Sequence, residues 1–128
     1  MSTNYFILTK NKELLTIYGL NAEVTDTPDW GYWVHILQLC PGCVPLFQAH
    51  KNVRSLPDVF ALLQEPTVLI YDEYYRLVEE THEAFCNKLQ EICNNPENKS
   101  RNWDNYTWAN TNYYKDRYGN EFFEGDFR

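Results

Sequence analysis

The stretch CPGC at residues 40–43 has the residue types and spacing of half a zinc site or of a redox pair. A structural zinc site needs four ligands, usually from two such pairs. The other two cysteines, Cys86 and Cys93, lie seven residues apart in an apolar helical pattern, which is the wrong spacing for a second pair. His35 and His50 flank the motif and are the remaining candidate ligands. A metal site at CPGC is therefore an alternative rather than the leading interpretation.

The same stretch also has the sequence of a tight turn. Proline fixes φ at the first central position of a type II turn, and glycine supplies the positive φ of the second. Strand-like sequence lies on both sides of CPGC, whereas a thioredoxin-like redox site would place its cysteines where a strand meets a helix. We interpret Cys40 to Cys43 as a turn, and we expect no metal and no cofactor.

The acidic stretch YDEYYR at residues 71–76 is the next candidate for chemistry. Asp72 and Glu73 are adjacent, so on a strand their side chains point to opposite faces and cannot form a close catalytic pair. A polar turn is the simpler interpretation. No serine or cysteine stands at a recognisable nucleophile spacing from a histidine, and the five glycines are scattered. The sequence therefore predicts no catalytic residues and a non-enzymatic protein.

The last third of the chain is rich in aromatic residues and asparagine. Aromatic rings interleaved with lysine and arginine could stack on nucleic acid bases, but acidic residues in the same stretch nearly cancel the positive charge. Tyrosine and tryptophan are also favoured at the hot spots of protein interfaces. We expect these rings to pack on the fold or to contact a partner protein. The partner-binding candidates among them are Trp103, Trp108, Tyr113 and Tyr114.

The formal net charge of −7 argues against direct binding to nucleic acid, which requires a basic surface. An acidic chain could instead engage a protein with a basic surface, or its charge could simply keep a small domain soluble. In the first case the steering residues would be Asp72, Glu73, Glu79, Glu80 and Glu83. No signal peptide and no membrane-length apolar run is visible, so we expect a cytoplasmic protein with reduced cysteines.

A chain of 128 residues is typical of one domain. Short β-rich runs at residues 5–9 and 14–18 predict a hairpin. Residues 32–39 are apolar on both faces and predict a central strand. The strand after CPGC begins near Pro45, which predicts an edge position or a bulge.

Capping residues and helical spacing predict helices at residues 55–66 and 81–95. Between them, residues 67–75 predict a buried strand that leads into a turn. The predicted fold class is α+β: a small, mostly antiparallel sheet with two helices packed on it and an irregular, aromatic-rich C-terminal segment. Residues 1–95 would form the core domain, and residues 96–128 the segment packed on it.

A series of short motifs resembles a family of small uncharacterised bacteriophage accessory proteins. The motifs are WVHI, GCVPLFQAH, VRSLPDVFALLQE, VLIYDEYYR and YGNEFFEGDFR. This chain departs from the family pattern at CPGC, where the family has small polar residues, and at Tyr75, where the family tends to have glycine. The resemblance implies a phage protein that acts inside a bacterium, and it carries no established activity. The matching residues are His35, Ile36, Phe47, His50, Asp72, Glu73, Tyr74, Gly119, Phe122 and Phe127.

These features favour a non-enzymatic, protein-binding phage accessory factor that acts on a host or phage protein in the host bacterial cytoplasm. Its narrowest form is an inhibitor of a bacterial defence system, an anti-CRISPR-like protein that blocks a basic channel sterically. The alternative is a small-molecule or nucleotide-binding protein or enzyme with a pocket around His35, which Trp33 and Tyr74 would also line. A homodimer could also bury the surplus aromatic residues. We expect no direct binding to nucleic acid and none to a membrane.

Overall fold

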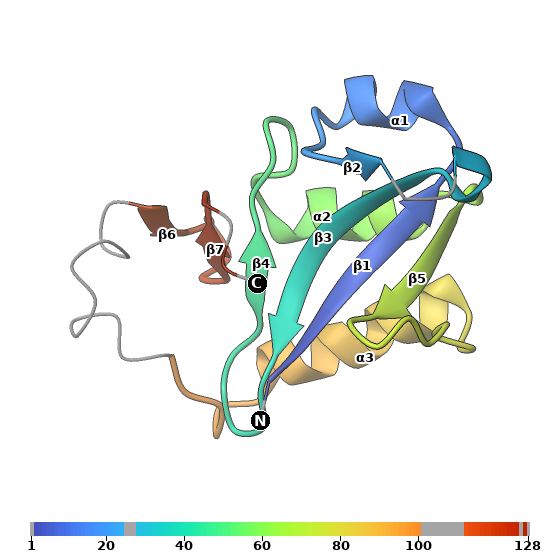
Figure 1. Cartoon of the computed structure of the whole chain (residues 1–128). Helices are drawn as coiled ribbons and strands as arrows, with labels where there is room; N and C mark the ends of the chain where they lie inside the picture. Colours follow the sequence, from blue (N-terminus) through green and yellow to red (C-terminus); the bar gives the residue numbers. More distant parts are fainter. Residues whose placement is uncertain (1, 25–27, 101–111, 126, 128) are drawn as a thin grey trace.

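The computed structural model describes residues 2–24, 28–100, 112–125 and 127, and strands in these residues form one sheet. The order across the sheet is β5-β1-β3-β4-β7-β6, and β2 pairs with β3. The pairing of β4 with β7 is parallel and the other strand pairings are antiparallel. The predicted α+β class is confirmed (Figure 1). The strands are β1 (Thr3–Thr9), β2 (Glu23–Val24), β3 (Tyr32–Leu39), β4 (Leu46–Gln48), β5 (Val68–Asp72), β6 (Tyr113–Lys115) and β7 (Glu121–Phe123).

Two of the helices cover one face of this sheet. Figure 1 shows α2 (Leu56–Leu63) and α3 (His82–Asn94) on the same side of β1 and β3, while α1 (Lys12–Ile17) lies at one end. The two helices predicted at 55–66 and 81–95 are confirmed. None of the helices in the described ranges is long and apolar enough to cross a membrane. The core between sheet and helices includes Ile7, Val34, Ile36, Val68, Ile70, Val59, Leu62, Phe85 and Leu89.

The predicted hairpin of residues 5–9 and 14–18 is wrong in its second half, because α1 occupies that stretch. Asn11 caps the helix, and its side-chain oxygen accepts a hydrogen bond of 3.1 Å from the Glu13 N–H. Leu14 is buried against the core. The cap satisfies an N–H group at the start of the helix, and burial of Leu14 adds tertiary stabilisation. Together they outweigh the β propensity of LLTIY.

The predicted edge position of the strand after Pro45 is also wrong. In the sheet β4 lies between β3 and β7, so it is an interior strand. Pro45 immediately precedes Leu46, the first residue of β4, and therefore removes no hydrogen bond from the strand ladder.

The described part of the C-terminal segment is more regular than expected. Residues 113–115 and 121–123 form the β6–β7 hairpin, and β7 pairs with β4. The Ala49 N–H also donates to the Phe123 carbonyl over 2.9 Å. Phe122 and Phe123 are fully buried. This pairing joins residues far apart in the chain, which local sequence patterns do not reveal.

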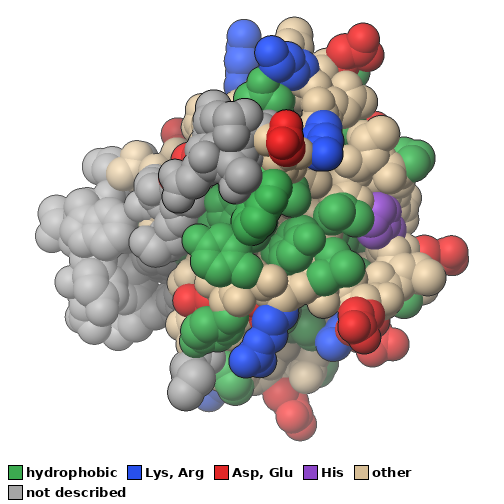
Figure 2. Space-filling view, turned by 45° about the vertical axis from the view of Figure 1, so that its right-hand side comes forward, with side chains coloured by type: hydrophobic (Ala, Val, Ile, Leu, Met, Phe, Trp, Pro, Cys, Tyr) green, Lys and Arg blue, Asp and Glu red, His purple; other side chains and the backbone are tan. Residues whose placement is uncertain are grey.

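Among the described residues, no α-helix covers the second face of the sheet. Side chains alternate along β1 and β5, so the neighbours of their core residues point to this open face. On it, Leu8 of β1 stands directly between Trp33 of β3 and Leu69 of β5. The next row places Phe6 beside Tyr71. Figure 2 shows hydrophobic side chains gathered in the middle of one face of the molecule, with charged groups around them.

Candidate functional site

A pocket of about 740 Å³ opens on this face of the sheet. Its floor is formed by side chains from three adjacent strands, and its walls come from the η1 helix (Pro28–Trp30) and from the hairpin after β5. The pocket is therefore built on strands that the core holds in place. The lining residues that matter below are Leu8, Trp30, Trp33, Leu69, Tyr71 and Tyr75.

Trp33 is the centre of the aromatic floor. Its ring stacks on Phe6 at 4.8 Å between centroids and contacts Tyr71 at 5.6 Å and Tyr75 at 5.3 Å. Gly31, at φ +103°, precedes β3, and a Cβ there would lie 2.4 Å from the Thr9 carbonyl oxygen. Only glycine allows this close approach of η1 to the end of β1.

The hairpin after β5 places Tyr75 at the rim of the pocket. The Tyr75 N–H donates to the Asp72 carbonyl over 3.2 Å, and the Asp72 N–H donates to the Arg76 carbonyl over 3.0 Å. Tyr75 itself has φ +61°. This is the pattern of a three-residue hairpin loop whose last residue is left-handed, where glycine is usual. Tyr75 therefore occupies a position whose backbone conformation favours glycine.

Hydrogen bonds hold the polar end of the pocket to neighbouring parts of the fold. The Thr9 hydroxyl donates to the Thr67 carbonyl over 3.2 Å and accepts from the Asn11 N–H at 3.0 Å. Lys10 and Asp29 supply one charge of each sign. The described lining contains no histidine or cysteine. The aromatic surface of the described lining suits the binding of an apolar or aromatic group.

Among the three predicted pocket residues, Trp33 lines this pocket, whereas His35 and Tyr74 are not among its lining residues. Tyr74 is exposed in the hairpin, beside Tyr75. His35 is buried, with Nδ1 2.9 Å from Gln48 Oε1 and Nε2 2.9 Å from Asn4 Oδ1. These contacts join β1, β3 and β4, so His35 serves the fold.

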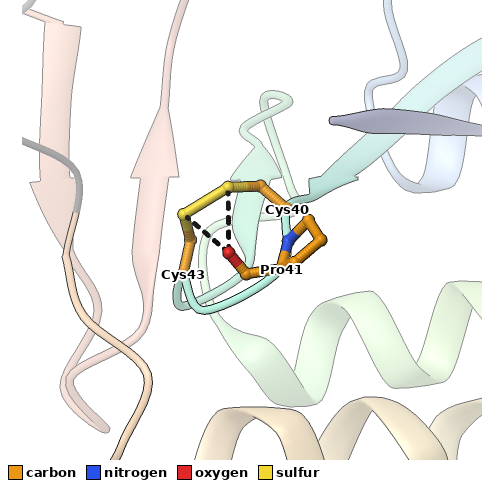
Figure 3. Close-up of a disulfide and its surroundings, with 3 residues drawn as sticks. All are labelled: Cys40, Pro41 and Cys43. Atoms are coloured by element: carbon orange, nitrogen blue, oxygen red, sulfur yellow. Dashed lines mark hydrogen bonds between the residues drawn. A yellow bond between two sulfur atoms is a disulfide. The ribbon is translucent and has the colours of Figure 1, made fainter. Parts of the chain in front are cut away.

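The CPGC motif forms the predicted turn. The Cys43 N–H donates to the Cys40 carbonyl over 3.1 Å, and Gly42 has φ +77°, as a type II turn requires. The expectation of reduced thiols differs from the structure, in which the two sulfur atoms form a disulfide (Figure 3). The turn allows this disulfide to form because it brings the Cα atoms of Cys40 and Cys43 to 5.4 Å from each other. No cluster of three or more histidine, cysteine or acidic side chains suited to a metal occurs in the described ranges.

The structure separates the five acidic residues predicted to steer a partner. Asp72 accepts from the N–H groups of its own hairpin, and Glu73 Oε1 accepts from the Asn4 N–H at 2.8 Å. The Asp72 carboxylate therefore stabilises its own hairpin, and the Glu73 carboxylate joins that hairpin to the start of β1. Glu79, Glu80 and Glu83 are exposed, and Glu80 lies 3.4 Å from Lys88 Nζ. Glu79, Glu80 and Glu83 therefore remain free of the fold's interior and can interact with a basic partner.

Two of the aromatic partner-binding candidates have structural roles. The Tyr113 hydroxyl donates to Glu121 Oε2 over 3.0 Å, and burial followed by this carboxylate raises the pKa of Tyr113 to about 12. The Tyr114 hydroxyl donates to the Arg54 carbonyl over 2.9 Å, and chiefly burial raises the pKa of Tyr114 to about 12. The remaining two candidates, Trp103 and Trp108, lie outside the described residues.

Sequence reasoning missed Trp30, Leu69, Tyr71 and Tyr75 as a group. A usable signal was present in VLIY at residues 68–71, because large apolar residues at every position give a strand two apolar faces. In the sheet β5 is an edge strand, and the α-helices of the described residues cover its core-facing side, so its second apolar face is left exposed.

Comparison of the chain with protein-family models, with curated proteins and with solved structures gives no match. The site is therefore interpreted from its own residues and geometry.

Proposed function

We propose that this chain is a non-enzymatic protein-binding module that engages its partner through the open face of the sheet. The observation that carries the proposal is an apolar strip of exposed side chains: Trp30, Leu69, Tyr74, Tyr75 and Leu77. Their exposed fractions run from 46% at Leu69 to 70% at Tyr75. Large exposed apolar patches on small proteins usually mark interaction sites, and tryptophan and tyrosine are favoured at interface hot spots.

The charge of the chain and its motifs narrow the class of partner protein. A net charge of −7 favours a protein with a basic surface. The resemblance to phage accessory proteins favours a host or phage protein inside a bacterium. The narrowest form of the proposal is a steric inhibitor of a bacterial defence protein, supported by this charge and this resemblance alone.

The test is capture of proteins from bacterial lysate on the tagged chain, at low and at moderate salt. Trp30→Ser and Leu69→Ser should abolish capture of the stoichiometric partner, because they remove apolar contact area from the strip. Ile17→Ser is the matched control, since Ile17 is 60% exposed on α1 and lies outside the strip. A partner that both strip variants retain, or that the control also loses, would contradict binding through this face.

A second candidate function is binding of a small organic molecule in the pocket. A volume of about 740 Å³ lies in the range of ligand sites. Leu77→Ser separates the two functions, because Leu77 belongs to the strip but not to the pocket lining. Screening nucleotides and aromatic carboxylates by thermal shift should give a stabilising compound whose effect Leu77→Ser leaves intact. Failure of these compounds to shift the melting temperature would remove this candidate.

A further inference from the structure

Tyr75 has a backbone conformation that its contribution to the fold does not explain. A bulky residue at φ +61° is strained, and such strain persists where it serves a site. The ring is 70% exposed, so it adds little to the core. It instead contacts Trp33 and lines the pocket. Contact with a ligand accounts for a tyrosine here better than folding does.

The shape of the apolar surface indicates what the pocket receives. The rings of Tyr71 and Tyr75 are each tilted against Trp33, and a further aromatic ring gains extra attraction from such a set. The apolar surface also continues beyond the pocket to Leu77, which forms a bridge with Tyr71. A polypeptide that places one aromatic side chain in the pocket would cover both the pocket and the apolar surface at Leu77.

The partner cannot reach this face by extending the sheet along the described outer edge of β5. The Val78 N–H donates to the Ile70 carbonyl over 2.8 Å, and the Val68 N–H donates to the Glu65 carbonyl over 3.2 Å. The Asp72 N–H is taken by the hairpin as well. With this edge occupied, recognition has to come from side chains on the open face.

The exposed carboxylates that follow Leu77 in the chain indicate which residues would flank that aromatic side chain. Glu79, Glu80 and Glu83 follow Leu77 in the chain and are exposed. One lysine, Lys88, lies close to this group, at 3.4 Å from Glu80. A peptide whose aromatic residue lies in the pocket would gain from lysine or arginine near these carboxylates.

We infer that the pocket binds an aromatic side chain of a partner protein next to lysine or arginine residues, and that Tyr75 is the residue of the pocket that selects it. This inference rests on the proposed protein-binding function and names the chemistry of the partner. Tyr75 covers one side of the bound ring, Trp33 lies beneath it, and the glutamates beyond Leu77 pair with the adjacent basic residues.

The experiment is selection of random displayed peptides on the immobilised full chain, with counter-selection on the Tyr75→Gly variant. This variant retains the left-handed turn, so it should fold. The enriched peptides should share a tryptophan, tyrosine or phenylalanine close to lysine or arginine. A synthetic consensus peptide, followed by fluorescence anisotropy, should bind Tyr75→Gly about tenfold more weakly. Ile17→Ser should bind it unchanged, and Glu79→Lys combined with Glu83→Lys should weaken binding most at low salt.

Each of the following results would overturn the inference. One is the enrichment of no peptide, and another is a consensus without an aromatic or without a basic residue. Equal binding to Tyr75→Gly would also overturn it, as would a dimer of the chain in sedimentation that Leu69→Ser dissociates. Capture of a lysate protein that depends on Trp30 and Leu69 but not on Tyr75 would leave the protein-binding function standing and remove only this inference.

Discussion

At the residue scale, Tyr75 combines an unfavourable backbone conformation with a largely exposed ring. The left-handed conformation costs an L-residue about 1–2 kcal/mol, and glycine avoids this cost. Glycine also makes the unfolded chain more flexible, which offsets part of the gain. We expect Tyr75→Gly to raise the free energy of unfolding by about 0.5–1 kcal/mol, measured by urea denaturation. Tyr74→Gly is the control, since Tyr74 has no positive φ; equal effects at both positions would contradict the account.

His50 gives a second prediction at this scale. It is buried, its Nε2 lies 2.9 Å from the His35 carbonyl oxygen, and its Nδ1 accepts from the Asn21 N–H at 3.0 Å. This arrangement requires the neutral ring, and burial lowers the pKa of His50 below 6.5. Between the folded pKa and 6.5 the unfolded chain binds more protons than the folded one.

The free energy of unfolding should therefore have its full His50 contribution above about pH 6.5 and lose it as the pH falls through the folded pKa. Urea denaturation at a series of pH values measures this loss. The variant His50→Gln removes the titrating ring, so its stability should depend less on pH in this window. An unchanged pH dependence in the variant would show that other groups cause it.

At the scale of elements, the two long helices differ in how they begin. The Thr81 hydroxyl accepts from the Ala84 N–H at 3.1 Å, whereas Ser55 makes no side-chain hydrogen bond at the start of α2. Loss of a bonded cap costs about 1 kcal/mol. We expect Thr81→Ala to lower the free energy of unfolding by about 1 kcal/mol and Ser55→Ala by clearly less. A larger loss at Ser55 would mean that the hydrogen bond is not what stabilises the start of α3.

At the scale of the whole molecule, the C-terminal hairpin belongs to the same sheet as the N-terminal strands. Phe122 is fully buried and stacks on Phe47 of β4 at 5.2 Å between centroids. Phe122→Ala should therefore lower the free energy of unfolding by about 3–5 kcal/mol in urea denaturation. Tyr118→Ala, at an exposed position of the same hairpin, should change it little. A small loss at Phe122 would indicate a hairpin that does not contribute to the cooperative fold.

Local sequence patterns were sufficient to predict the elements that short stretches of sequence specify. The helices around residues 55–66 and 81–95 followed from caps and apolar spacing, and the turn at Cys40 to Cys43 followed from Pro-Gly. The central strand at 32–39 followed from two apolar faces. The strand predicted at 14–18 is wrong because the Asn11 cap and the burial of Leu14 together outweigh β propensity.

Only the tertiary structure decided which apolar faces are buried and which are left open. From the sequence alone, the large side chains of Leu69 and Tyr71 are as suited to a buried strand as those of Val68 and Ile70. The two helices cover one face of the sheet, so one pair lies in the core and the other lines a pocket. The tertiary structure also decided the role of His35. The sequence suggested a histidine in a ligand pocket, whereas in the structure its ring nitrogens contact the side-chain amides of Asn4 in β1 and Gln48 in β4. Sequence determined the central strand, the two long helices and the CPGC turn because their signals are short in range, whereas the candidate site depends on contacts between distant segments.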